Sequence, residues 1–325
     1  MDGLKRVNFL KPYIFVSYAN ADNIQVLSDV IRLQQEGINV WIDSELQRYT
    51  GRSWKKVVFQ AMKNPNCKAV LFFISKFSLM SDAVKYELDT TRDLIVKGTH
   101  YQKDIPILPI EVTTIDNIME FCNSLAEECA LDEIMVNSEL PDEDEYIPSE
   151  NVIYIRENFF SDNSIMRYRI FDKENIKKFL ETLSQYGVQC NDKFIPCQQD
   201  LNLLMKEGRR FRKLGMLQDA FNSFKKAALA GSVEAYVAIG YLNEIMEQMS
   251  VHQYKQAESC FIRAIDLHQM PAKLGLAILY YNGCEYRKAR KILGEIQNSK
   301  NYLNSIKLKN TYNQLVKSLS MYGEK

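Results

Sequence analysis

Short apolar runs alternate with amphipathic stretches through the first half of the chain. Runs rich in β-branched and aromatic residues predict five strands, at residues 13–18, 38–42, 69–74, 105–110 and 152–155. The central run is apolar without alternation, which is typical of a strand buried on both faces of a parallel sheet. Between the runs, apolar residues recur at helical spacing, and Gly37 and Gly187 stand where two helices would end. The pattern predicts an α/β domain with a mostly parallel, five-stranded sheet.

The stretch after the central run carries the main candidate for chemistry. A polar loop leads into a helical pattern with apolar Val84 and Leu88, and Ser81 or Asp82 is placed to cap that helix. Glu87 falls about a turn and a half into the helix. The loop brings it near the carboxyl ends of the strands, where ligands bind in open α/β sheets. An arbitrary glutamate at such a position would be a solvated residue, stabilised near the helix N-terminus.

The second half of the chain changes character. Residues 191–200 read as a linker, and from residue 201 the pattern is helical. The spacing of Ala, Phe and Ala in residues 220–228 recurs 37 residues later in residues 257–265, and a degenerate third copy follows. A period in the thirties predicts stacked helix–turn–helix repeats rather than an ordinary helical bundle. We therefore expect a first domain at 1–190, a linker, and an all-α repeat domain at 201–325 whose last helix, about 305–320, is a cap.

Composition narrows the function classes. The chain has 41 basic and 41 acidic residues and no net charge, so we expect neither nucleic acid nor membrane as a partner. It lacks a long apolar run and a secretory signal pattern, which favours a cytoplasmic protein. Seven scattered cysteines without a CxxC pair favour free thiols in a reducing compartment. Only three histidines are present, so we expect no metal site and no histidine-based triad.

Ordered motifs across residues 11–187 resemble a TIR (Toll/interleukin-1 receptor) domain. They are the Ser-Tyr end of the first strand, Val40-Trp41-Ile42-Asp43, Gly51 with Trp54, Ile74-Ser75, Ser81, Glu87-Leu88, and Ile107-Leu108-Pro109-Ile110. This resemblance implies a flavodoxin-like fold. Many bacterial TIR domains hydrolyse or cyclise NAD+, using a glutamate of the αC helix, and Glu87 matches that glutamate. The resemblance thus implies an NAD+ nucleosidase that makes nicotinamide and ADP-ribose or a cyclic isomer, with NAD+ as substrate and no cofactor.

Further contacts with the substrate are expected around Glu87. The residues are Ser17, Tyr18, Asp43, Leu46, Tyr49, Gly51, Ser81 and Ala83. Four of them also have a possible structural role. Ser17 and Tyr18 end a strand, Asp43 could cap a loop, and Gly51 suits a turn. The loop that carries Leu46, Arg48 and Tyr49 could instead contact a neighbouring TIR domain. Trp54 more often packs in a core than against a ligand.

The chain departs from active relatives in two places: Ala19-Asn20 follow the Ser-Tyr motif where basic residues often stand, and the second place lies just before Glu87. Several of them have an aromatic residue four positions before the glutamate, where this chain has Ala83. Phe77 or Tyr86 could supply the missing ring. This departure keeps open the alternative of a non-enzymatic adaptor in which both domains bind proteins, as many animal TIR domains do. A third alternative is a bacterial mimic of a host's TIR signalling.

The helical half resembles Sel1-like repeats, relatives of the tetratricopeptide repeat. That resemblance implies binding of a protein or peptide, and with the TIR domain it implies a role in bacterial antiviral defence. TIR sites are often completed by a neighbouring subunit, which implies self-association. Two charged stretches are expected to be solvated surface, although contact between them is an alternative: the acidic end of an insert at 116–149, and the cations Lys206, Arg209, Arg210, Arg212 and Lys213.

Overall fold

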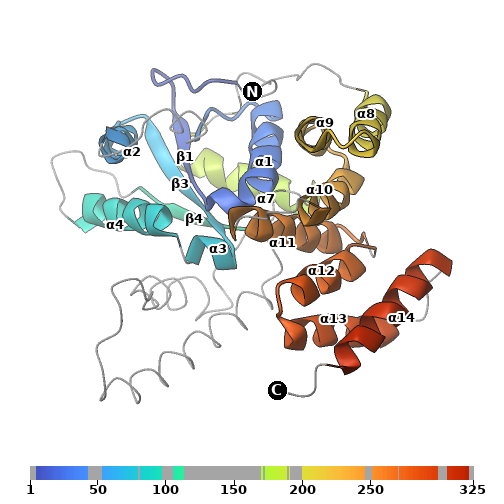
Figure 1. Cartoon of the computed structure of the whole chain (residues 1–325). Helices are drawn as coiled ribbons and strands as arrows, with labels where there is room; N and C mark the ends of the chain where they lie inside the picture. The colour runs from blue at the N-terminus through green and yellow to red at the C-terminus, as the bar shows by residue number, and fades with distance from the viewer. Residues whose placement is uncertain are drawn as a thin grey trace, which may run out of the picture. The chain divides into compact units, whose positions relative to one another are not determined.

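The computed structural model describes most of the chain in separate segments (Figure 1). They are residues 5–42, 53–79, 81–96, 105–112, 170, 173–188, 190, 200–245, 251–269, 271–298 and 306–321. Contacts divide the chain into two compact units. The first comprises Met1–Asn20 with Asp29–Pro196, and the second comprises Ala21–Ser28 with Cys197–Lys325. The division at residues 196–197 falls inside the predicted linker, while the predicted domain boundaries stay a prediction.

A parallel sheet forms the centre of the first unit. Its described strands are β1 (Tyr13–Ser17), β2 (Val40–Ile42), β3 (Cys67–Ile74) and β4 (Ile107–Glu111), in the order β2-β1-β3-β4. All three pairings are parallel, as the alternation of strands and helices predicts. Four strands are therefore found where five are predicted, because residues 152–155 lie outside the described residues. The central strand is buried along nearly its whole length, as its unbroken apolar run predicts.

Helices connect the strands. They are the short 3-10 helix η1 (Asn20–Asp22), α1 (Asn23–Gln35), α2 (Ser53–Lys63), α3 (Lys76–Leu79), α4 (Asp82–Val96) and α7 (Lys173–Gln185). Gly37 ends α1 with φ 91°, and its N–H and that of Ile38 donate to Gln34 and Leu33 carbonyls at 3.0 Å each. This is a Schellman cap, which needs a left-handed residue at the glycine position.

One face of the sheet packs against α2. Tyr13, Phe15 and Val70 form a buried cluster with Val58 and Met62, and the ring of Phe15 stacks on Trp41 of the neighbouring strand at 4.4 Å. Figure 1 shows α2 and α4 on the same side of the sheet. Side chains alternate between faces along a strand, so every second residue of β1 and β3 points toward these two helices.

The second unit is helical. Its helices are α8 (Leu201–Lys213), α9 (Leu217–Leu229), α10 (Val233–Ile245), α11 (Val251–Asp266), α12 (Pro271–Asn282), α13 (Tyr286–Asn298) and α14 (Ile306–Ser320). Phe224 of α9 and Phe261 of α11, which are 37 residues apart, are both fully buried. A Cβ on Gly208 would lie 2.5 Å from the Phe224 ring, and one on Gly240 would lie 2.6 Å from the Phe261 ring. Each phenylalanine thus sits directly against a glycine of the helix before it, which is why small and bulky residues recur together.

The second unit also includes the start of α1. Ile24 belongs to its buried apolar cluster. The Ser259 hydroxyl donates to Asp22 Oδ1 at 2.5 Å and accepts a hydrogen bond from Gln25 Nε2 at 2.9 Å. All three polar side chains are buried. Burial of polar groups is tolerated only when they are paired, so this chain of hydrogen bonds holds residues 22–25 in one arrangement with α11.

Candidate functional site

Glu87 lies on the buried side of α4. Val84, Leu88 and Thr91 are fully buried, and Glu87 is 4% exposed. The four positions follow the i, i+3, i+4, i+7 spacing of one helix face, so the carboxylate shares the stripe that packs inward. The residue is not without a partner in the fold, as a buried polar group requires. Glu87 is therefore not the solvated helix residue that a lone glutamate near a helix N-terminus would usually be.

Ser81 fixes the start of the helix that carries Glu87. Its hydroxyl accepts a hydrogen bond from the Val84 N–H at 3.4 Å, and its carbonyl accepts one from the Lys85 N–H at 2.9 Å. The first hydrogen bond is that of an N-cap residue, as the sequence predicts. Ala83 is exposed in the first turn of α4. A substrate contact at either residue stays a prediction.

Aromatic rings hold the outer side of α4 against α2. Tyr86 meets Trp54 edge to face at 5.4 Å between ring centroids, and its hydroxyl donates to the Lys55 carbonyl at 3.3 Å. The Lys55 ammonium lies 5.0 Å from the Tyr86 centroid. Trp54 packs against the sheet cluster, which agrees with the structural role expected for it. Tyr86 is thus engaged with α2, and Phe77, the other ring considered, is 8% exposed in α3.

Ser17 ends β1 at the carboxyl edge and points toward α2 and α4. It alternates with Tyr13 and Phe15, which pack on that face, and it pairs with Phe72 of β3. Its side chain is fully buried, and its hydroxyl has no hydrogen-bond partner among the described residues. Tyr18 follows it and is half-buried. The fold therefore directs the Ser17 hydroxyl to the face of the sheet on which Glu87 also lies.

A second buried carboxylate, Glu111, lies at the same edge. It is 2% exposed and is the last residue of β4, opposite Ile74 of β3. Ile107 pairs with Val70, so Ile107, Pro109 and Glu111 point to the α2 and α4 face. Sequence reasoning missed Glu111 because it ends the fourth strand at Ile110. The alternation of side chains along the strand could have revealed it. Glu111 lies two residues after Pro109 and therefore points to the same face of the sheet as Pro109.

Four predicted substrate contacts lie outside the described residues. They are Asp43, Leu46, Tyr49 and Gly51, and Arg48 of the same loop is with them. Their roles stay predictions. Within the described residues, the carboxyl edge brings Ser17, Glu87 and Glu111 to one face of the sheet and leaves Ala83 on the exposed side of α4.

The two carboxyl groups and the hydroxyl on this face determine which ligands suit the carboxyl edge of the sheet. Negative charge in a buried setting stabilises positive charge far more than the same charge in water does. Among the described residues, no group of three or more His, Cys, Asp or Glu side chains is arranged to hold a metal ion. The arrangement suits a ligand in which positive charge is present or develops.

The comparison with protein families agrees with this geometry. Residues 14–125 match the TIR domain family. The match covers β2, β3, β4, α4 and all of β1 except Tyr13, so Ser17, Glu87 and Glu111 fall inside it. It stops before the helical unit, for which no repeat family is identified. No curated protein and no solved structure matched the chain.

In the part of the chain that the structure describes, no helix is both long enough and apolar enough to span a bilayer.

Proposed function

We propose that the protein is an NAD+ nucleosidase that cleaves the bond between nicotinamide and ribose, with Glu87 as the catalytic residue. The observation that carries the proposal is the burial of Glu87 on the inward stripe of α4, within the TIR match. A carboxylate is costly to bury. Its position at the carboxyl edge of a parallel sheet is the position of ligand sites in such folds.

The chemistry needs one well-placed carboxylate. Cleavage of the glycosidic bond passes through an oxocarbenium-like state with positive charge at the anomeric carbon, which a carboxylate stabilises. Nicotinamide leaves as a neutral molecule from a pyridinium, so no general acid has to protonate it. Water then gives ADP-ribose, whereas attack by another group of the same substrate gives a cyclic isomer.

Two other residues on the same face of the sheet support the role of Glu87. Glu111 adds a second carboxyl group on the same face of the sheet, and in its ionised form it would favour the cationic nicotinamide ring and a cationic transition state. The Ser17 hydroxyl is buried and has no partner among the described residues, so its hydrogen-bonding capacity is left for a ribose hydroxyl if a substrate enters this edge. We assign Ser17 and Glu111 to substrate positioning rather than to the bond-breaking step.

The helical unit and self-association belong to the same proposal. We infer that TIR units associate to complete the site, and that the helical unit binds a protein or peptide that controls this step. A defence role, in which NAD+ loss or a cyclic nucleotide is the output, follows from the same reasoning. The support is the TIR match together with successive helices in which two phenylalanines recur at the repeat spacing, each against a glycine of the preceding helix.

A signalling adaptor is the second candidate, and one observation favours it. Position 83 carries an exposed alanine in place of an aromatic residue, and the nearby Tyr86 ring is held by Trp54 and Lys55. The described residues around Glu87 therefore offer no free ring to stack on nicotinamide or adenine. In that case Glu87 would hold α4 in place rather than act on a substrate.

NAD+ consumption by the purified full chain decides between the two. Glu87→Gln keeps the shape of the side chain and removes the charge, and Glu181→Gln on the exposed side of α7 is the matched control. We expect Glu87→Gln to lower the rate by about 100-fold or more, with the control unchanged. Chromatography of the products separates hydrolysis from cyclisation.

Thermal unfolding of each variant shows whether the fold is intact. Equal NAD+ loss in all three proteins would contradict the assignment of Glu87. No loss at high protein concentration, with a crowding agent present, would favour the adaptor.

A further inference from the structure

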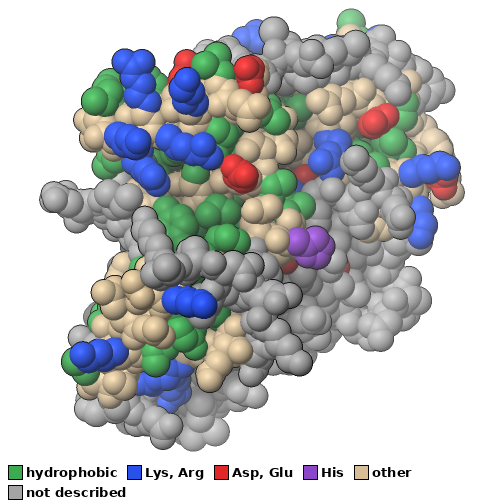
Figure 2. Space-filling model, turned by 90° about the vertical axis from the view of Figure 1, so that its right-hand side faces the viewer, with side chains coloured by type: hydrophobic (Ala, Val, Ile, Leu, Met, Phe, Trp, Pro, Cys, Tyr) green, Lys and Arg blue, Asp and Glu red, His purple; other side chains and the backbone are tan. Residues whose placement is uncertain are grey.

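The outward face of α8 carries a dense group of cations. All five basic side chains of residues 206–213 are exposed, and one carboxylate, that of Glu207, stands among them. The inner side of the helix is fixed, because Met205 and Gly208 are buried and a Cβ on Gly208 would lie 2.5 Å from the Phe224 ring of α9. Figure 2 views the side of the molecule on which Figure 1 draws α8, and it shows Lys and Arg side chains gathered beside hydrophobic ones. The packing of α8 against α9 therefore holds the cations toward solvent.

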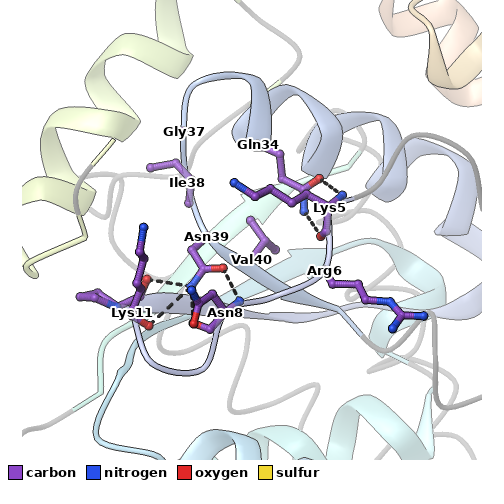
Figure 3. A pocket seen from close by; sticks show the side chains of 10 residues that line it. Lys5, Arg6, Asn8, Lys11, Gln34, Gly37, Ile38, Asn39 and Val40 are labelled. Carbon is purple, nitrogen blue, oxygen red and sulfur yellow. Dashed lines mark hydrogen bonds between the residues drawn. The ribbon is translucent and has the colours of Figure 1, made fainter. Parts of the chain in front are cut away.

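Most of these cations are left without a partner. Arg209 pairs with Glu234 of α10 at 3.3 Å, and both side chains are more than half exposed. Among the described residues, the other four form no side-chain hydrogen bond or ion pair: Lys206, Arg210, Arg212 and Lys213. Another group of cations, at the pocket where β1 and β2 begin (Figure 3), is different, because Arg6 and Lys11 there already take part in interactions. On α8 the positive charges remain for a partner.

Exposed apolar side chains stand at the two ends of the same face. Leu203 is 52% exposed, and Leu214 is 62% exposed. Leu203, Lys206, Arg210 and Leu214 follow the spacing i, i+3, i+7 and i+11, so they form one stripe along the helix. At 1.5 Å per residue the two leucines lie about 16 Å apart. The exposed face of α8 is thus apolar at each end and basic in the middle.

This arrangement suits neither a bilayer nor a nucleic acid. A helix that lies on a membrane buries its apolar face in the lipid, whereas the apolar face of α8 already packs in the helical unit. Proteins that bind single strands stack bases on aromatic rings, and the one aromatic residue of α8, Phe211, packs against the core of its own unit. Glu207, beside the stripe, would also be repelled by a surface that is negative throughout.

We propose that this face of α8 binds an acidic peptide segment of a partner protein, with an aliphatic residue at each end of the acidic run. The carboxylates pair with Lys206, Arg210 and Lys213, and the aliphatic residues cover Leu203 and Leu214. An extended chain advances about 3.3 Å per residue, so an acidic run of about four residues spans the distance between the two leucines. The proposal rests on the part of the proposed function that gives the helical unit a peptide partner, and it names that partner's chemistry.

Fluorescence anisotropy of a labelled peptide tests the proposal. The probe is Leu-Asp-Glu-Asp-Glu-Leu, capped at both ends so that it carries no terminal charge, and it is titrated with the purified full chain. The test variant is Lys206→Gln/Arg210→Gln/Lys213→Gln. These side chains are exposed and form no hydrogen bond or ion pair within the described part of the chain, so the fold should be kept. Thermal unfolding of each protein checks this.

The matched control is Arg287→Gln/Lys309→Gln/Lys317→Gln. It also removes one arginine and two lysines, from exposed positions of α13 and α14 in the same unit. The control therefore has the same net charge as the test variant, and any difference between the two comes from where the charge was removed. A second peptide, Ala-Asp-Glu-Asp-Glu-Ala, keeps the acidic run and lacks the aliphatic ends.

We expect saturable binding of the leucine peptide that the test variant weakens by about tenfold or more and the control variant leaves unchanged. The alanine peptide should bind more weakly, because it buries less apolar surface against Leu203 and Leu214. Binding should also weaken as the salt concentration rises, because the charges are exposed. Absence of saturable binding, equal affinity in the test variant, or equal affinity for the alanine peptide would each overturn the proposal.

Vesicles that contain phosphatidylserine and a single-stranded thymidine homopolymer are the companion probes. Tighter binding of either one than of the leucine peptide, lost in the test variant, would overturn the proposal and assign this face of α8 to a membrane or to a nucleic acid. The titrations contain no NAD+, so the two proposals fail separately. A chain that binds the peptide and leaves NAD+ intact would keep this proposal and lose the enzyme, and a chain that cleaves NAD+ without binding the peptide would do the reverse.

Discussion

Gly240 is the position at which a single methyl group tests the packing of the helical unit. In Gly240→Ala the new Cβ would lie 2.6 Å from two atoms of the Phe261 ring and 2.8 Å from a third. Carbon atoms in contact are normally about 3.5–4.0 Å apart, so the ring would have to recede by roughly 1 Å. It cannot recede freely, because a Cβ on Gly275 of the next helix would lie 2.4 Å from the same ring. Phe261 is held between two glycines.

The cost follows from two opposing terms. Overpacking a dense core costs about 1–3 kcal/mol, while alanine is a better helix former than glycine by about 1 kcal/mol. Gly294→Ala isolates the second term, since Gly294 is also inside a helix and its Cβ would have no atom within 4 Å. We expect Gly294→Ala to stabilise the protein and Gly240→Ala to be less stable than Gly294→Ala by about 1–3 kcal/mol.

Hydrogen exchange measured by mass spectrometry shows which helices lose stability in Gly240→Ala. Peptides from α10 and α11 should exchange faster in Gly240→Ala, by about tenfold for each 1.4 kcal/mol lost. Phe261→Leu in the same chain should recover part of the loss, because the smaller side chain leaves room for the methyl group. Gly240→Ala that is as stable as Gly294→Ala would show that the ring and the glycine are not in firm contact.

Three further predictions concern buried polar groups. Ser259→Ala leaves Asp22 and Gln25 without their shared partner and should cost about 1–3 kcal/mol in thermal unfolding, whereas Ser320→Ala on the exposed end of α14 should change little. Burial raises the pKa of the Cys67 thiol from 9.0 to about 12. The thiol therefore contributes stability that is full below about pH 9 and is lost as the pH rises toward 12, and urea unfolding of Cys67→Ala should show a weaker decline over that range. Glu111→Gln should raise the KM for NAD+ more than it lowers kcat; an unchanged KM would remove Glu111 from the site.

Much of the first unit could be predicted from local pattern. The apolar runs gave the four described strands to within about two residues, and Gly37 marked the end of α1 because its left-handed conformation suits glycine. The burial of Glu87 could not be predicted in the same way. Helical spacing places Glu87 beside the apolar stripe of Val84 and Leu88. Whether its side chain is buried depends on how α4 packs against the sheet.

Other parts of the site depended on register. Glu111 reaches the carboxyl edge because β4 pairs with β3 so that Glu111 stands opposite Ile74, and pairing between strands is not written in either strand alone. The assignment of residues 21–28 to the helical unit had no local signal either, because the Ser259 hydroxyl that binds Asp22 is more than 200 residues away in sequence. The pattern of apolar residues does not show which polar groups, far apart in the sequence, will form hydrogen bonds.

The shortness of β2 bears on how copies of the protein could assemble. Among the described strands β2 stands at one edge of the sheet, and it has only three residues. Just before it, the Asn39 side chain donates to the main-chain oxygens of Asn8 and Pro12. A short edge strand is a poor template for adding another chain, and proteins use this to prevent uncontrolled aggregation. Ordered assembly that continues the sheet at the described part of β2 is therefore disfavoured.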